Sequence, residues 1–336
     1  MDELRTTGPQ TGPPASPGRT VAVTVGVDVG GTTIATVVLD EHGAVVAHAE
    51  SATPTGATAL ATAVADAVQD VVARAGLTAA DVLGVGVGVP GVVDPEAGTV
   101  THAVNLGIEG SAPLAVLVAD ELVRTGLGRV RVRVENDLNA AVLGAAHELG
   151  SRADAPADDL AFVALGTGLA AGLMLDGRLR RGPHRAAGEI GHLRYVPDGL
   201  PCKCGQSGCL ERYASGSALD AAWGASRTGR PAPVEVFEAA DAGDERAVVV
   251  RDEFVAAVAA AVRILVLTCD LGRIVVGGGV SQLGEPLLRA LTAELERQAV
   301  SSPFLAAADL PNRVQLAPVG VPIGAIGAAL VGRGER

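Results

Sequence analysis

Hydrophobic residues recur along the chain in two patterns, which take turns from one segment to the next. One, at every second residue, is typical of strands, and the other, at every third or fourth residue, is typical of helices. Residues 21–29, "VAVTVGVDV", alternate and are rich in β-branched side chains, which predicts a strand that ends at the glycine turn "GGTT". Residues 34–40 and 44–50, separated by the turn "EHG", predict two further strands of a meander. Residues 57–75 place apolar side chains at helical spacing. The chain therefore opens with a β-meander followed by an amphipathic helix.

The alternation of strands and helices continues to the C-terminus and predicts an α/β fold. Short apolar stretches broken by glycine, as in buried parallel strands, occur at residues 83–91, 131–137, 272–279 and 314–320. Helical spacing marks residues 112–126, 138–150, 244–270, 285–298 and 323–330.

The stretch at residues 159–182, "DLAFVALGTGLAAGLMLDGRLRRG", repeats the pattern of the opening. In both places a strand runs into Gly-Thr, a second apolar strand follows, and Leu-Asp leads into a turn. This duplication predicts two related α/β halves. Backbone amides in such glycine turns can approach phosphate oxygens, although the same turns could be simple hairpin connections.

Length and composition narrow the classes of function. A chain of 336 residues is long enough for two domains, and its net charge of −12 argues against a nucleic-acid partner. No apolar run reaches the about 18–20 residues of a membrane span, so no membrane partner is expected. Residues 1–20 are rich in proline and glycine and lack the apolar core of a secretion signal, which predicts a disordered tail. The lack of a secretion signal and the low count of four cysteines favour a location of the protein in the reducing cytoplasm.

The stretch "VENDLNAA" (134–141) ends a predicted strand and opens a predicted helix. A carboxylate at a strand end in a cleft can accept a proton from a substrate hydroxyl, which makes Asp137 a candidate general base. Asn and Asp are also common helix N-caps, so Asn136 or Asp137 could serve only to cap the helix. The residues alone leave both interpretations open.

A series of motifs then occurs in a characteristic order: "DVGGTT" (28–33), "GVPGVVD" (88–94), "VNLG" (104–107), "VENDLNAA" (134–141), "LGTG" (165–168), "GPHRAAGEIGH" (182–192) and "CKCGQSGCLE" (202–211). From about residue 21 to the C-terminus the chain thereby resembles the ROK family of bacterial sugar kinases and related repressors. The Glu-x-x-His and Cys-x-Cys-Gly-x-x-Gly-Cys-x-Glu block is the most specific of these motifs.

The resemblance implies a two-domain actin-like ATPase fold, of the ribonuclease H-like type, with a cleft between the domains. The expected division is a tail at 1–20, a small α/β domain of 21–133 with the C-terminal helix 320–336, and a large α/β domain of 134–319 that carries the cysteine loop. The family is commonly dimeric or tetrameric, so a homodimer or homotetramer is expected.

The activity that the resemblance implies is ATP-dependent phosphorylation of the 6-hydroxyl of an aldohexose, with glucose as the first choice. N-acetylglucosamine and N-acetylmannosamine are alternative substrates, and polyphosphate is an alternative donor. Asp137 resembles the general base, while Mg²⁺ and hairpin amides would stabilise the charge on the γ-phosphate. The sugar-binding set is matched by Asn105, Asn136, Asp137, Glu189, His192 and Glu211.

The glycine turns match the nucleotide-binding loops of the family. Asp28 matches the residue that reaches Mg²⁺ through water, and the ATP-binding set is completed by Gly30, Gly31, Thr32, Thr33, Thr167, Gly168, Gly277, Gly278 and Gly279. The chain departs from the family at Thr33, where lysine is usual, and after "NLG", where tryptophan is frequent. Ala170 and Ala171 replace glycines that usually follow the second turn, which predicts a narrower phosphate loop.

Three of the four cysteines, Cys202, Cys204 and Cys209, lie close together, and His192 precedes them. The intervening residues include two prolines and a glycine, so a turn can bring the histidine back to the cysteines. Zn²⁺ binds Cys and His in a tetrahedron, and four protein ligands leave no position for a reactive water. The pattern therefore predicts a structural zinc site, and free loop cysteines are the alternative.

Two other classes of function fit the sequence less well. A sugar-sensing regulator of the same family would carry an N-terminal winged helix-turn-helix domain, for which about 20 proline-rich residues are too few. A zinc hydrolase would need an open metal position, against which the cysteine count argues.

Overall fold

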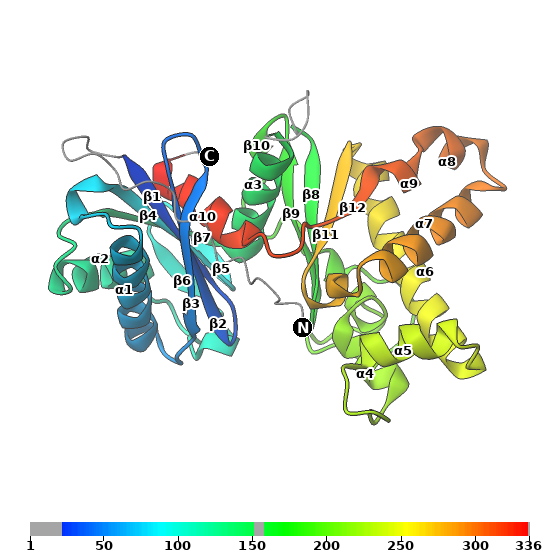
Figure 1. Ribbon diagram of the computed structural model, residues 1–336. Helices are drawn as coiled ribbons and strands as arrows, with labels where there is room; N and C mark the ends of the chain where they lie inside the picture. Colours follow the sequence, from blue (N-terminus) through cyan, green and yellow to red (C-terminus); the bar gives the residue numbers. More distant parts are fainter. Residues whose placement is uncertain (1–21, 151–157, 335–336) are drawn as a thin grey trace, which may run out of the picture.

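Two five-stranded β-sheets lie side by side in the computed structural model, and helices pack on the faces of each sheet (Figure 1). The structure describes residues 22–150 and 158–334. The tail predicted at residues 1–20 therefore lies outside the described residues.

The first sheet contains the opening meander and two parallel strands. Its order is β3 (Val45–Ala52), β2 (Thr33–Leu39), β1 (Val23–Val29), β4 (Val82–Val89) and β7 (Arg131–Asn136). β1 pairs antiparallel with β2 and parallel with β4. Helices α1 (Ala57–Arg74) and α2 (Leu114–Arg124) share a valine-rich core with one face of this sheet. Shorter elements complete this half: η1 (Ala79–Asp81), β5 (Val92–Asp94), β6 (Thr99–Thr101) and η2 (Val104–Leu106).

The second sheet has the same topology. Its order is β10 (Arg178–Leu179), β9 (Leu169–Leu175), β8 (Leu160–Leu165), β11 (Arg273–Gly277) and β12 (Val314–Leu316). The β8–β9 hairpin is antiparallel, and β11 and β12 add in parallel, as β4 and β7 do in the first sheet. The duplication predicted from the two Gly-Thr hairpins is thereby confirmed.

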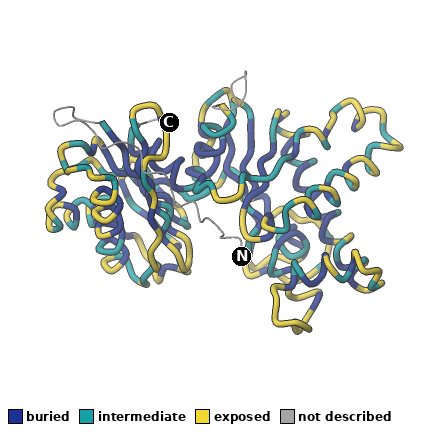
Figure 2. The backbone as a smooth tube through the Cα atoms, viewed as in Figure 1, coloured by how far each residue is buried: buried dark blue, intermediate teal, exposed yellow. Residues whose placement is uncertain are grey.

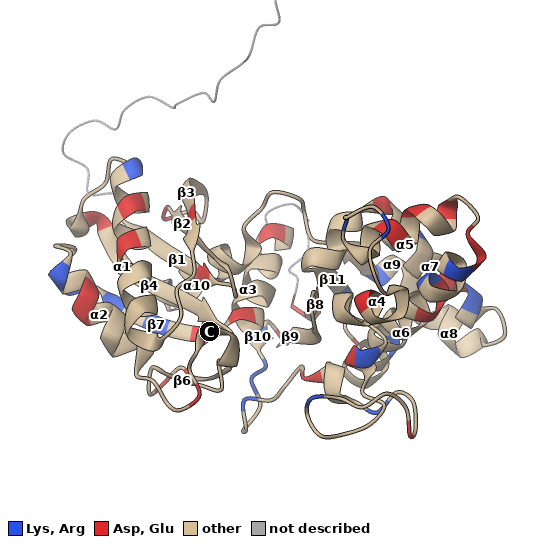
Figure 3. Ribbon diagram, turned by 90° about the horizontal axis from the view of Figure 1, so that it is seen from below, with Lys and Arg blue, Asp and Glu red and all other residues tan. Residues whose placement is uncertain are grey.

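Helices cover the outer face of the second sheet: α4 (Gly216–Trp223), α5 (Ala232–Asp241), α6 (Glu245–Cys269), α7 (Glu285–Ala299), α8 (Pro303–Ala308) and α9 (Leu310–Arg313). Alternate residues of β8 face opposite ways, with Ala161 and Val163 in this outer core and Leu160 and Phe162 in a second core. The charge of −12 is spread along the chain, and Figure 3 shows both acidic and basic residues on α1 and α2 as well as on α5 to α7.

That second core lies between the sheets and contains α3 (Asp137–Gly150) and α10 (Ile323–Arg333) (Figure 1). The two helices touch backbone to backbone, because a Cβ atom at Gly327 would lie 1.7 Å from the carbonyl oxygen of Ala140. A Cβ atom at Gly86 of β4 would likewise lie 1.8 Å from the carbonyl oxygen of Ala328. The small residues of the last helix therefore let it pack against the first sheet, and residues 325–332 are all buried there (Figure 2).

The predicted strands and long helices are present, and the two-domain α/β class is confirmed. Sequence patterns missed the shorter helices α4, α5, α8 and α9. The division into domains stays a proposal, and its expected boundary after residue 133 falls inside β7. Within the described part of the chain, no helix has the length and apolar character needed to cross a membrane.

Candidate active site

The motif at residues 134–141 forms the junction between β7 and α3. Asn136 ends the strand, and its Oδ1 accepts the amide protons of Leu138 at 3.0 Å and Asn139 at 3.2 Å. Asn136 is thus the helix cap. Asp137 begins the helix, and its carboxylate forms no ion pair with a cationic side chain of the described residues. Asp137 Oδ1 also accepts the amide proton of Leu138 at 2.9 Å. The structure therefore assigns the capping role to Asn136, and the role of Asp137 as a general base stays a prediction.

Asp28, near the end of β1, lies beside Asp137, with glycines on two sides of its carboxylate. A Cβ atom at Gly88 would lie 3.6 Å from Asp28 Oδ1 and 3.7 Å from the Cα atom of Asp137, and one at Gly324 would lie 2.2 Å from Asp28 Oδ2. Burial, followed by the charge of Asp137, raises the pKa of Asp28 to about 7. Two neighbouring carboxylates with this mutual repulsion fit a site for a divalent cation such as Mg²⁺.

Burial also raises the pKa of Asp137, and the charge of nearby Glu189 adds to the effect. Glu189 precedes η3 (Ile190–His192), and its side chain is 57% exposed. The loop can lie flat on β9 because glycines flank Glu189: Cβ atoms at Gly188 and Gly191 would lie 1.8 Å and 2.1 Å from carbonyl oxygens of that strand. A carboxylate with a raised pKa is suited to accept a proton near neutral pH.

The first glycine turn joins β1 to β2 and is exposed at all the positions predicted to bind phosphate, Gly30, Gly31, Thr32 and Thr33. Gly30 donates its amide proton to the carbonyl oxygen of Thr33 at 2.8 Å. Thr53, the residue after β3, closes the turn, since its Oγ1 donates to the carbonyl oxygen of Gly30 at 2.9 Å. The position where lysine is usual in the family is therefore the solvent-facing start of β2.

The other two glycine turns pack against each other at the ends of β8 and β11. Gly278 has a φ of +89°, and a Cβ atom there would lie 2.7 Å from the carbonyl oxygen of Leu165. Gly277 ends β11 and Gly279 begins η5 (Gly279–Leu283), so both belong to this turn. The structure therefore brings the second and third predicted phosphate turns together.

The second turn, which contains Thr167, is also tied to α4, a contact that the sequence did not suggest. Gly216, the first residue of α4, donates its amide proton to the carbonyl oxygen of Gly166 at 2.6 Å. Ala170 and Ala171, the residues predicted to narrow this turn, lie inside β9 and pair with residues of β8, and the narrowing stays a prediction.

Glu211, in η4 (Leu210–Arg212), lies against the second turn. Its Oε2 accepts the amide proton of Leu169 at 3.1 Å, and a Cβ atom at Gly168 would lie 2.5 Å from the same oxygen. Glu211 thus connects the cysteine loop to the second phosphate turn. Asn105, in contrast, is exposed in η2, and no side chain of the described residues forms a polar contact with it.

The predicted zinc ligands meet in one cluster. One donor atom from each of His192, Cys202, Cys204 and Cys209 lies within 4.8 Å of all the others. The Sγ atoms of Cys204 and Cys209 are 3.6 Å apart, and Cys202 Sγ is 4.0 Å from His192 Nδ1. Zn–S bonds of about 2.3 Å in a tetrahedron place sulfur atoms about 3.8 Å apart, so the cluster fits Zn²⁺.

The ring of His192 has two different neighbours. Nδ1 faces the cysteines, whereas Nε2 lies 4.0 Å from Glu189 Oε2. The imidazole of His192 can therefore serve both the predicted metal site and the predicted sugar site.

The thiol of Cys204 is suited to bind a metal. Hydrogen bonds from the backbone and side chain of Gln206 lower the pKa of Cys204 to about 6, which favours the thiolate that a metal binds.

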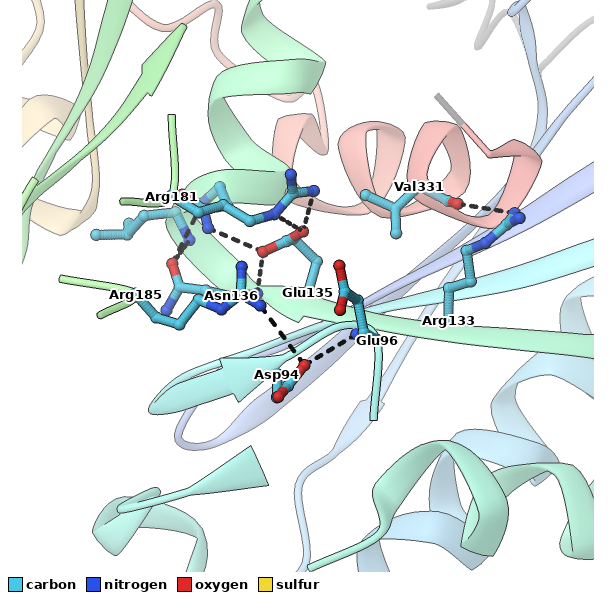
Figure 4. Close-up of polar contacts among 10 residues, drawn as sticks. Asp94, Glu96, Arg133, Glu135, Asn136, Arg181, Arg185 and Val331 are labelled. Atoms are coloured by element: carbon cyan, nitrogen blue, oxygen red, sulfur yellow. Dashed lines mark hydrogen bonds and ion pairs between the residues drawn. The ribbon is translucent and has the colours of Figure 1, made fainter. Parts of the chain in front are cut away.

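A buried glutamate in the same motif escaped the sequence analysis. Glu135 is 1% exposed and accepts hydrogen bonds from Arg181, which lies after β10 (Figure 4). No clear sequence signal marks its burial, because Arg131, Arg133 and Glu135 occupy the polar positions of an alternating strand, a pattern that predicts exposure. Its partner could not be identified from the sequence, because Arg181 is one of several arginines in its loop.

Comparison with known proteins decides the family. The family model described as "ROK family" matches residues 24–334. The chain belongs to the ROK family. A Streptomyces coelicolor protein named glucokinase is 34% identical over 90% of this chain and 95% of its own length. A Vibrio cholerae protein named N-acetylmannosamine kinase is 31% identical over 80% of this chain and 87% of its own.

Among solved structures, a ROK family glucokinase from Streptomyces griseus in complex with glucose and AMPPNP is similar throughout. It aligns with a TM-score of 0.72 and 34% identity, over 93% of this chain and 99% of the other. This ROK member therefore shares the arrangement of both sheets with a sugar kinase.

Proposed function

We propose that the protein is an ATP-dependent hexokinase that phosphorylates the 6-hydroxyl of glucose. The observation that carries the proposal is Asp137, a carboxylate of raised pKa, without a cationic partner among the described residues, at the start of a capped helix. The similar protein named glucokinase and the similar glucokinase solved in complex with glucose and AMPPNP support the same activity for this protein.

In this proposal Asp137 accepts the proton of the sugar hydroxyl as that oxygen attacks the γ-phosphate in line. Amide groups of the glycine turns that contain Gly31, Thr167 and Gly278 would donate to phosphate oxygens. Mg²⁺ supplies positive charge beside the phosphates when it is bound, and Asp28 is the residue proposed to reach it. Because no lysine follows the first turn, positive charge beside the phosphates would come from an arginine, from Mg²⁺ or from the backbone amides alone.

The sugar is proposed to lie among Asn105, Asn136, Glu189, His192 and Glu211. Carboxylates, an imidazole and amides together can accept from and donate to neighbouring hydroxyl groups in fixed directions. Glu211 also contacts the second phosphate turn, so sugar and nucleotide would meet near this residue.

We propose that Zn²⁺ bound by His192, Cys202, Cys204 and Cys209 is structural. The cluster joins η3 to η4, and these two short helices carry His192 and Glu211. A closed tetrahedral site would fix both side chains without taking part in the reaction.

A panel of hexoses in a coupled ADP-release assay tests the activity. Glucose-dependent ADP release, with much lower rates for N-acetylglucosamine and N-acetylmannosamine, is the expected result. The relative named N-acetylmannosamine kinase makes that sugar the second candidate, and a higher kcat/KM for it would replace glucose. Polyphosphate in place of ATP tests the donor. No turnover with any sugar would favour a sugar-sensing regulator.

The protein is further proposed to act in the cytoplasm as a homodimer or homotetramer. Light scattering on the purified protein, with and without glucose, measures its molar mass directly. A monomer under both conditions would contradict the proposed assembly.

A further inference from the structure

An ion pair joins the two sheets behind the helix cap that precedes Asp137. Arg181 donates from Nε at 2.8 Å and from Nη2 at 2.6 Å, both to Oε2 of Glu135. The side chain of Glu135 is 1% exposed and that of Arg181 is 20% exposed. Glu135 belongs to β7 of the first sheet, whereas Arg181 follows β10 of the second (Figure 4).

The other oxygen of Glu135 holds the cap of α3. Oε1 accepts the amide proton of Asn136 at 3.1 Å and a proton from Nδ2 of Asn139 at 2.8 Å. Asp137 lies between these two residues in the chain. Glu135 therefore holds the backbone on both sides of Asp137, through the residue before it and the residue two after it.

The backbone of Arg181 is tied to the loop that carries Glu189. Its carbonyl oxygen accepts the amide proton of Ala187 at 3.3 Å, and Ala187 directly precedes Gly188, which packs on β9. Arg185 in the same loop lies 3.7 Å, from Nη2 to Oδ1, from Asp94 at the end of β5, in the small two-stranded sheet. Arg181 thus connects the helix cap beside Asp137, through Glu135, with the loop that carries Glu189.

We propose that Arg181 is a positioning residue of the kinase reaction, which, through Glu135, sets the geometry between Asp137, Asn136 and Glu189. This inference rests on the proposed hexokinase activity. Arg181 does not act on substrate itself, because its Nε and one Nη are directed to Glu135. A planar guanidinium that donates twice in a fixed direction holds a carboxylate more precisely than an ammonium can.

The test compares Arg181→Met, Arg181→Lys, Glu135→Gln and the double variant Arg181→Met/Glu135→Gln, with Arg180→Met as the matched control. Arg180 is the adjacent residue, and its side chain is exposed. Each variant is measured for kcat, for the KM of glucose and for thermal stability. Hydrogen–deuterium exchange of residues 134–141 gives a readout that does not depend on turnover.

We expect Arg181→Met to lower kcat by roughly 10- to 100-fold with a smaller change in KM, because a shift of about 1 Å at a reacting group has this effect. Arg181→Lys should recover part of kcat. The double variant removes the unpaired buried charge, so stability should return while kcat stays low. Exchange at residues 134–141 should be faster in Arg181→Met than in Arg180→Met.

Several outcomes would overturn the inference. These are a kcat for Arg181→Met within about twofold of wild type, a double variant that regains kcat together with stability, or unchanged exchange at residues 134–141. If Arg181→Met does not fold, Arg181→Lys and Glu135→Gln decide by the same measures. A wild-type protein without activity on any sugar would refute the hexokinase proposal instead. The exchange experiment would still test whether the ion pair between Arg181 and Glu135 holds residues 134–141 in place.

Discussion

The carboxylates of Asp28 and Asp137 and the carboxylate of Glu235 differ in what surrounds them. Glu235 on α5 is 6% exposed. Its carboxylate accepts hydrogen bonds from Trp223 Nε1 at 2.9 Å, from Ser226 Oγ at 2.6 Å and from the amide of Thr228 at 2.7 Å. These hydrogen bonds lower its pKa. The pKa values of Asp28 and Asp137 are raised instead.

The difference separates Glu235, whose charge the protein stabilises, from the two carboxylates that are proposed to act in the site. Donors directed at Glu235 stabilise its charge and connect the loop before α5 to the helix. Asp28 receives no hydrogen bond from the described residues, and its nearest charge is a second carboxylate. A group whose charge is left unsatisfied by the protein can exchange a proton or bind a cation.

Removal of the proposed base is expected to have the largest effect. Asp137→Asn keeps the shape of the side chain but cannot accept a proton, so kcat should fall about 10³-fold while the KM for glucose changes little. Steady-state kinetics measures both values, with Asp220→Asn on the exposed face of α4 as the control. A kcat within tenfold of wild type would exclude Asp137 as the base.

The pH profile of the wild-type enzyme sharpens the same point. Burial and the charge of Glu189 favour the protonated form of Asp137, so the acid limb of kcat should lie above the ordinary aspartate value of 3.8. Glu189→Gln should move this limb to lower pH. A limb that does not move would show that Glu189 has no influence on the base.

Asp28→Asn should have the second largest effect on kcat, a loss of about 100-fold, since it removes a charge beside the transferred phosphate. The same change should stabilise the Mg²⁺-free protein at pH 8. The folded-state pKa of about 7 lies above the ordinary 3.8. The stabilising contribution of Asp28 is therefore complete below about pH 4 and is lost as the pH rises through 7.

Thermal melts with chelator at pH 4.5 and pH 8 test this reversal. The Asn variant should be more stable than wild type at pH 8, and the difference should shrink at pH 4.5. Equal differences at both pH values would mean that Asp28 titrates normally in the folded protein.

Loss of the zinc site should have an intermediate effect. Cys204→Ser removes one of four ligands, so it should abolish the zinc content of about one per chain, reduce the folded yield and raise the KM for glucose on the order of tenfold. Cys269→Ser, in the last turn of α6, is the matched control. Unchanged stability and kinetics after chelation would contradict a structural metal.

Glu235→Gln should have the smallest effect on catalysis. It replaces an ionised acceptor of several hydrogen bonds, so Tm should fall by roughly 5 °C, while kcat and KM remain those of wild type. Calorimetry and the sugar kinase assay check the two halves of the statement. A large loss of kcat would show that the loop before α5 also serves the active site.

Part of the fold could be predicted because its signals are local. The strands of both hairpins and α6 follow from the spacing of apolar residues, and the two Gly-Thr turns revealed the duplication. The short helices α4 and α5 were missed because each offers only two or three turns of spacing. Ser215, whose Oγ accepts the amide proton of Ala218 at 3.1 Å, was the cap signal for α4.

The sequence by itself determined the family motifs, the duplicated hairpins and the set of cysteine and histidine ligands, because neighbours in the chain carry these features. Only the tertiary structure decided the properties of the carboxylates. Asp28 meets Asp137, and Glu135 meets Arg181, across segments that are distant in the sequence. Charge interactions depend on distance and burial in space, and these are fixed only when the sheets, α3 and α10 pack together.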